Sequence, residues 1–61
     1  MSKEFHDTVW PQDTVSAGVW GKTIEIESSR DSGTQWTFLT PSDARDFANQ
    51  ILVLVQDIET T

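Results

Sequence analysis

Residues 39–59 read LTPSDARDFANQILVLVQDIE, and this stretch predicts one long helix. Thr40 is a favourable N-cap, and Pro41 suits the first helical position, because an N–H there would have no partner within the helix. Asp43 lies three residues after the cap, as the acidic residue of a capping box does, and its charge suits the positive end of the helix. No glycine or proline follows Pro41, so the helix is expected to span residues 41–58.

One side of this helix is apolar and is expected to cover a sheet. Its members recur at the spacing of a helical stripe: Ala44, Phe47, Ala48, Ile51, Val55 and Ile58. At 100° per residue the stripe spans about 100°, with Leu52 and Leu54 on its flanks and Val53 on the far side. Two interpretations stay open. The flanks are buried on the sheet, or Leu52, Val53 and Leu54 are interface residues that a second copy or another partner covers.

Two alternating segments precede the helix and predict strands at residues 14–20 and 22–28. Gly21 between them can adopt the positive φ that a tight turn requires. A two-residue turn at Trp20–Gly21 would place Val15 opposite Ile26 and Ala17 opposite Ile24. Both pairs then lie on one apolar face.

A third strand is predicted at residues 34–39, after the polar connection SRDSG at residues 29–33. A type I turn with a glycine bulge suits this connection. A three-residue connection would bring Trp36 opposite Ile26 and Phe38 opposite Ile24, which extends the same apolar face. The expected fold is therefore α+β, a three-stranded antiparallel meander with one C-terminal helix packed across it (βββα).

The domain is expected to span residues 14–61, and residues 1–13 form an N-terminal arm. A short strand and a loose arm are both compatible with MSKEFHDTVWPQD. This segment has no apolar central region, so it does not resemble a secretory signal. The longest apolar run in the chain is five residues, far short of a membrane span. We expect a cytoplasmic protein with no membrane partner.

Composition limits the classes of function. The chain has 61 residues with 10 acidic and 4 basic side chains, a net charge of −6, no cysteine and one histidine. A domain of this size buries a thin core and usually gains stability from disulfides, a metal or an oligomer. Disulfides are excluded and a zinc site is not expected. The remaining sources of stability are a homo-oligomer, which we expect to be a dimer, and another protein partner. The acidic balance argues against direct nucleic-acid binding.

The acidic side chains form two groups in the predicted fold. Asp43, Asp46 and Asp57 fall within about 60° of each other on the helix, and Glu25 and Glu27 share one face of a strand. These groups are either solvated surface or an acidic decoy that imitates nucleic-acid phosphates and blocks a DNA- or RNA-binding protein. The decoy is the alternative function.

Trp10 and Trp20 are candidate interface anchors, because Trp10 precedes a proline and Trp20 lies at a turn. The other interpretation is that both rings cover the edges of a small core. The sequence contains few candidate catalytic residues. The serines lie in predicted turns or caps, and His6 lies in the N-terminal arm, which shows no periodic pattern. We therefore expect no catalytic residue, cofactor or metal ligand, and a small non-enzymatic protein-binding module that self-associates.

From Thr23 onward the sequence resembles small acidic proteins that actinobacteria and their bacteriophages encode, most of them of unknown function. The resemblance rests on alternating strands that lead into a leucine-threonine-proline helix start, followed by an acidic residue and Ala-Arg. The matching stretch is LTPSDARDFA at residues 39–48. The aliphatic NQILVLVQ that follows departs from the alanine-rich pattern of that group. The resemblance implies a phage or accessory-gene origin and a host-protein partner, and it transfers no site residues.

Overall fold

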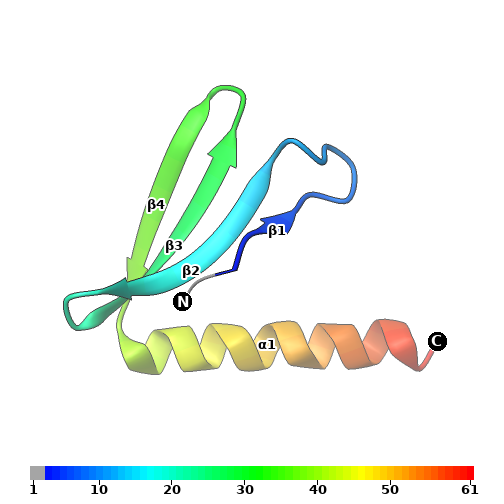
Figure 1. The fold of residues 1–61 in the computed structure, drawn as a ribbon. Coiled ribbons are helices and arrows are strands. Elements are labelled where there is room, and N and C mark those ends of the chain that lie inside the picture. Colours follow the sequence, from blue (N-terminus) through cyan, green and yellow to red (C-terminus); the bar gives the residue numbers. More distant parts are fainter. Residues whose placement is uncertain (1–2) are drawn as a thin grey trace.

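A computed structural model describes residues 3–61 as one antiparallel sheet and one helix (Figure 1). The sheet has the order β1-β2-β3-β4, so every strand lies beside its neighbour in the sequence. The α+β class is confirmed, whereas the expected count of three strands is wrong. The elements are β1 Phe5–His6, β2 Thr14–Trp20, β3 Thr23–Arg30, β4 Gly33–Leu39 and α1 Pro41–Glu59. The additional strand, β1, comes from the N-terminal arm, where Phe5 pairs with Val15 and His6 with Thr14.

The register of β2 on β3 differs from the expected one by two residues. Ala17 lies opposite Ile26 and Val19 opposite Ile24, because the turn residues are Gly21 and Lys22. Gly21 has a φ of 62°, which glycine adopts without strain. Because side chains alternate with a period of two, this shift keeps Ile24 and Ile26 on the expected face.

The register of β3 on β4 differs by one residue, and this inverts β4. The connection is the two-residue turn 31–32 rather than a three-residue one, so Trp36 lies opposite Glu27 and Phe38 opposite Glu25. The prediction that Trp36 and Phe38 join Ile24 and Ile26 on one face is therefore wrong. Leu39 takes that place, opposite Ile24.

The start of α1 is confirmed. Thr40 has extended backbone angles, and its Oγ1 accepts the N–H of Asp43 at 3.1 Å. At the other end the Thr60 hydroxyl donates to the carbonyl of Gln56, and the Thr61 hydroxyl donates to that of Asp57. These bonds satisfy carbonyl groups that have no partner within the helix. Within residues 3–61 no helix is both long enough and apolar enough to cross a membrane.

The sheet has two different faces, which are called the front and the back below. The front carries Phe5, Val15, Ala17, Ile24 and Ile26 and looks toward α1. The helix follows β4 directly and runs beneath the sheet, while the strands rise away from it, so the two layers diverge (Figure 1). Consequently α1 touches the sheet near its own N-terminal half, and the rest of the helix extends beyond the sheet.

Candidate functional site

The first functional observation is an open core. No side chain among residues 3–61 is buried. The chain exposes 5430 Å², whereas a compact monomer of 6.9 kDa exposes about 4,000 Å². Its radius of gyration is 13.0 Å, against about 10.5 Å for a compact chain of this length. The described fold therefore leaves apolar surface in contact with solvent that a single compact domain would bury.

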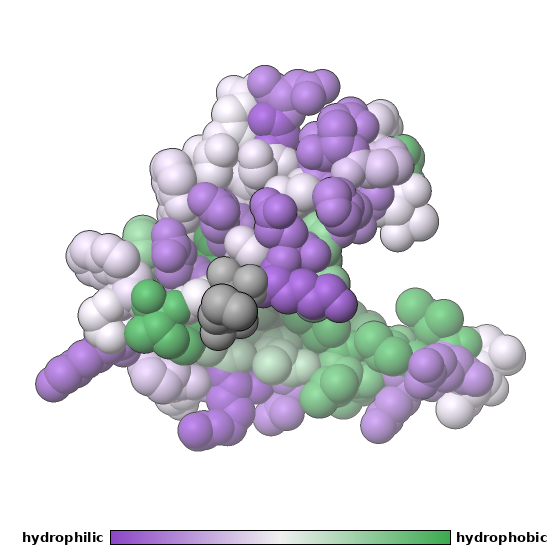
Figure 2. Space-filling model, in the orientation of Figure 1, coloured by the Kyte–Doolittle hydropathy of each residue, from purple (hydrophilic) through white to green (hydrophobic). Residues whose placement is uncertain are grey.

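Much of this surface lines a groove between the sheet front and α1, which we call the apolar wedge. Figure 2 shows hydrophobic residues along the side of α1 that faces the sheet, next to a hollow in the molecular surface. The wedge has a volume of about 300 Å³, and its apolar lining residues are Phe5, Val15, Ala17, Ile24, Ile26, Ala44, Phe47, Ala48 and Ile51. Even Phe47 and Ile51, which point into it, remain 47% and 45% exposed. The wedge is thus an unfilled core.

Beyond the wedge, the second half of α1 continues the apolar stripe without a sheet above it. Val55 and Ile58 belong to this stripe by helical rotation, and Ile58 is 76% exposed. Leu52 and Leu54 flank the stripe, while Val53 lies about 160–200° away from its centre. All three predicted interface residues of this run are exposed. The structure therefore separates them: Leu52 and Leu54 border the wedge side, and Val53 faces away from the sheet.

The two predicted tryptophan anchors are exposed but lie at opposite ends of the sheet. Trp10 belongs to the loop between β1 and β2, near Arg30 and Asp31 at the β3–β4 turn. Trp20 ends β2 at the other turn. The structure does not bring these two rings together, so they cannot contribute to one small site.

Trp20 instead forms part of a second surface on the sheet back. We define the aromatic–acidic face as Trp20, Glu25, Glu27, Trp36 and Phe38. The Trp20 and Phe38 rings meet across β3, with centroids 5.4 Å apart and planes tilted by 55°. This tilted arrangement is favourable for aromatic pairs. Both rings nevertheless stay exposed, which leaves them available to a partner.

Glu27 is positioned by its neighbours on this face. The Trp36 indole N–H donates to Glu27 Oε1 at 3.1 Å, and the Ser16 hydroxyl lies 3.5 Å from Glu27 Oε2. Sequence reasoning missed Trp36 and Phe38 as surface residues because it assigned a three-residue connection to the β3–β4 hairpin. Only a two-residue turn in place of the three-residue one would have predicted Trp36 and Phe38 on the sheet back.

The five predicted acidic residues do not form one surface. Glu25 and Glu27 lie on the sheet back, while Asp43, Asp46 and Asp57 lie on α1, which covers the front. The sheet stands between the two groups. Glu25 and Glu27 are also interleaved with aromatic rings, so their surroundings differ from those of the helix carboxylates.

A polar cluster at the β1–β2 loop was not expected from the sequence. Asp7 Oδ1 accepts the N–H groups of Val9 at 2.7 Å and Trp10 at 2.9 Å. These bonds, first that from Trp10 and then that from Val9, lower the pKa of Asp7, because they favour the charged carboxylate. His6 Nδ1 lies 2.8 Å from the carbonyl oxygen of Pro11. Both side chains therefore hold the loop in place.

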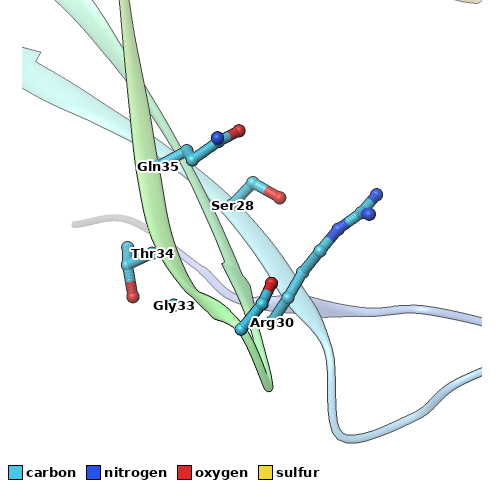
Figure 3. Close-up of a pocket in the computed structure, with 6 residues that line it drawn as sticks. Ser28, Arg30, Gly33, Thr34 and Gln35 are labelled. Carbon is cyan, nitrogen blue, oxygen red and sulfur yellow. The ribbon is translucent and has the colours of Figure 1, made fainter.

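Another hollow, of about 280 Å³, lies beside the β3–β4 turn (Figure 3). Ser28, Arg30 and Gln35 project from one side of the hairpin there, and Thr34 points to the other side. Its lining contains no carboxylate or imidazole to act as a base. Within residues 3–61, no group of three or more histidine and acidic side chains is arranged to hold a metal ion.

Comparisons with protein-family models, with curated proteins and with solved structures gave no match to this chain. The two surfaces that expose clustered apolar side chains are the apolar wedge and the aromatic–acidic face.

Proposed function

We propose that this chain is a non-enzymatic protein-binding module that self-associates as a homodimer. The observation that carries the proposal is the open core: no described side chain is buried, although the sheet front and α1 present complementary apolar surfaces. Apolar surface of this extent is typical of a protein whose core is completed by a partner.

The exposed area supports a second copy as that partner. Each chain exposes roughly 1,400 Å² more than a compact monomer of its mass. Two chains that buried this excess would share an interface of about 2,800 Å², which lies within the range of obligate homodimers. The area to be covered thus matches what a stable dimer buries.

The shape of the chain supports a reciprocal arrangement. With 19 residues, α1 is about 28 Å long, and its first half occupies its own wedge. The second half exposes Leu54 and Ile58, at 56% and 76%, and Val55, at 40%, continues the stripe between the wedge and Ile58. In a two-fold dimer, the second half of each helix would fill the wedge of the other chain. One chain therefore supplies both the groove and the element that fits it, as a symmetric interface requires.

The polar groups support a role without catalysis. His6 and Asp7 bond to backbone groups of their own loop. The hollow beside Arg30 holds hydroxyl, amide and guanidinium groups without a base. The resemblance of residues 39–48 to proteins of actinobacteriophages adds the proposal that a host protein is a further partner.

The experiment compares the mass in solution of wild type, Ile58→Asp and Gln56→Asp by light scattering at micromolar concentration. Ile58 lies on the stripe beyond the sheet, so a charge there would be buried without a partner in the dimer but solvated in a monomer. Gln56→Asp introduces the same charge in the same half of α1 at a polar position. We expect dimeric wild type and Gln56→Asp, and a folded monomeric Ile58→Asp by circular dichroism.

Val53→Asp distinguishes two modes of association. In the reciprocal arrangement Val53 faces away from the wedge and the variant remains dimeric. A contact between the outer sides of two helices would bury Val53, and the variant would then dissociate. A wild-type chain of monomeric mass at every concentration would overturn the proposed self-association.

A further inference from the structure

The aromatic–acidic face lies on the opposite side of the sheet from the apolar wedge, so the proposed dimer leaves it uncovered. Trp20, Trp36 and Phe38 are 65%, 53% and 50% exposed there. Exposed tryptophan and phenylalanine side chains grouped on one surface are typical of protein interaction sites. This surface is therefore available to a partner other than the one that fills the wedge.

The charge of the face defines the chemistry of that partner. Glu25 and Glu27 lie among the three aromatic rings. The back-facing residues of β2, β3 and β4 include no lysine or arginine. They are Thr14, Ser16, Gly18, Trp20, Thr23, Glu25, Glu27, Ser29, Thr34, Trp36 and Phe38. The whole chain carries a net charge of −6. A complementary partner is cationic, and its cations would meet both carboxylates and the faces of aromatic rings.

Part of this surface is open enough to receive a side chain. Gly18 lies opposite Glu25, and a Cβ atom built on Gly18 would have no heavy atom within 4 Å. By register, Trp20 follows Gly18 on the same face of β2, and Phe38 lies opposite Glu25, so this ring pair is next to the opening. On the other side Glu27 is held by Trp36 and Ser16. The opening thus combines an aromatic wall with a positioned carboxylate.

The spacing of the carboxylates favours an extended arginine-containing segment. Glu25 and Glu27 are two residues apart on a strand, which places their Cα atoms about 7 Å apart. An extended peptide repeats its same-side side chains at the same distance. Guanidinium is planar, stacks on aromatic rings and bonds to a carboxylate through two N–H groups, which a lysine ammonium does not do. We propose that this face binds an extended segment of another protein with arginine at alternate positions.

The probe is a nine-residue peptide of alternating arginine and serine, added to the ¹⁵N-labelled full chain. The indole N–H signals of the three tryptophans report the place of binding. Trp20 and Trp36 belong to the face, whereas Trp10 lies in the β1–β2 loop and serves as the internal control. We expect saturable shifts of the Trp20 and Trp36 signals with little change at Trp10.

Two double variants separate the site from general charge attraction. Glu25→Gln/Glu27→Gln and Asp46→Asn/Asp57→Asn remove the same two charges, but the second pair lies on α1. We expect the first pair to raise the Kd by about tenfold or more, as loss of a central contact does. The second pair should keep it within about twofold, because exposed distant charges are largely screened at physiological salt.

A peptide of the same composition with all arginines at one end tests the spacing and should bind more weakly. Equal weakening by both double variants, equal affinity for the two peptides, or shifts as large at Trp10 would overturn the proposal. Absence of binding at about 1 mM peptide would also overturn it. A Trp36 signal that moves with protein concentration alone would mean that a second copy of this chain covers the face, which contradicts the proposal as well.

Discussion

The two halves of α1 carry similar apolar stripes and have different surroundings. The first half places Ala44, Phe47, Ala48 and Ile51 into the wedge. The second half places Val55 and Ile58 on the same side of the helix, beyond the sheet. Helical periodicity therefore specifies the direction in which the stripe faces. The exposed fraction along it is 47% at Phe47 and 40% at Val55, and it rises to 76% at Ile58, near the helix end. In the proposed dimer, the apolar stripe of the second half packs against the wedge of the other chain.

The largest effect of a substitution on stability is expected in the first half of α1, which lines the wedge. Phe47→Asp would place a charge in the wedge against Ile26 and remove an aromatic ring from the wedge lining. In the proposed dimer the wedge is covered, so the charge would be buried without a partner. This burial and the loss of the aromatic side chain each cost several kcal/mol, which is comparable to the whole free energy of unfolding of a small domain. We expect Phe47→Asp to be unfolded by circular dichroism.

Asn49→Asp is the matched control, because it introduces the same charge two residues away at a polar position. It should fold and melt close to wild type. A folded Phe47→Asp chain would mean that the first half of α1 does not depend on the sheet. The contrast between the two halves would then be lost.

A smaller effect on stability is expected at the N-cap of α1. Thr40→Ala removes the hydroxyl that accepts the Asp43 N–H and should destabilise the fold by about 1 kcal/mol. In a domain of this size, that change lowers Tm by roughly 4–8 °C. Wild type and variant must be melted at equal protein concentration, because Tm of a dimer depends on concentration. An unchanged Tm would show that the cap does not stabilise α1.

The smallest effect is expected outside α1, in the β1–β2 loop. Hydrogen bonds from Trp10 and Val9 lower the pKa of Asp7 in the folded state. The stabilisation they provide is therefore complete above the unfolded-state pKa and is lost as the pH falls through the folded-state pKa. The amide signals of Val9 and Trp10 should titrate at a lower pH than an ordinary aspartate would give. A midpoint at the usual aspartate pKa would contradict the observed bonding.

The sequence predicted those parts of the fold that depend on local chemistry. Thr40 and Pro41 marked the helix start at the residue where the structure has it, and alternation placed Ile24 and Ile26 on the helix side of the sheet. The β3–β4 register depended on a single residue of turn length, and both lengths suit the polar residues 29–33. That one residue moved Trp36 and Phe38 from the expected core to the back of the sheet. The two-residue strand β1 is too short to show a period.

The candidate surfaces also divide into those that local sequence patterns predicted and those that depend on strand register. Helical rotation placed Val53 on the far side of the stripe, and it is exposed. For Leu52 and Leu54 the sequence left burial on the sheet and an interface both open, and the structure leaves both side chains exposed. The aromatic–acidic face could not be found, because it depends on the inverted register of β4. Asp7 was missed because its partners are backbone amides, which leave no side-chain pattern in the sequence.

The most direct test of the reciprocal dimer is an isotope-filtered NOE experiment. Labelled and unlabelled wild-type chains are mixed, refolded together, and observed so that only contacts between different chains give signals. The proposed dimer predicts intermolecular NOEs from the methyl groups of Leu54, Val55 and Ile58 to those of Val15, Ala17 and Ile26. A mixed sample with no intermolecular NOEs, or with NOEs from Val53 alone, would contradict the account that each α1 fills the wedge of a second copy.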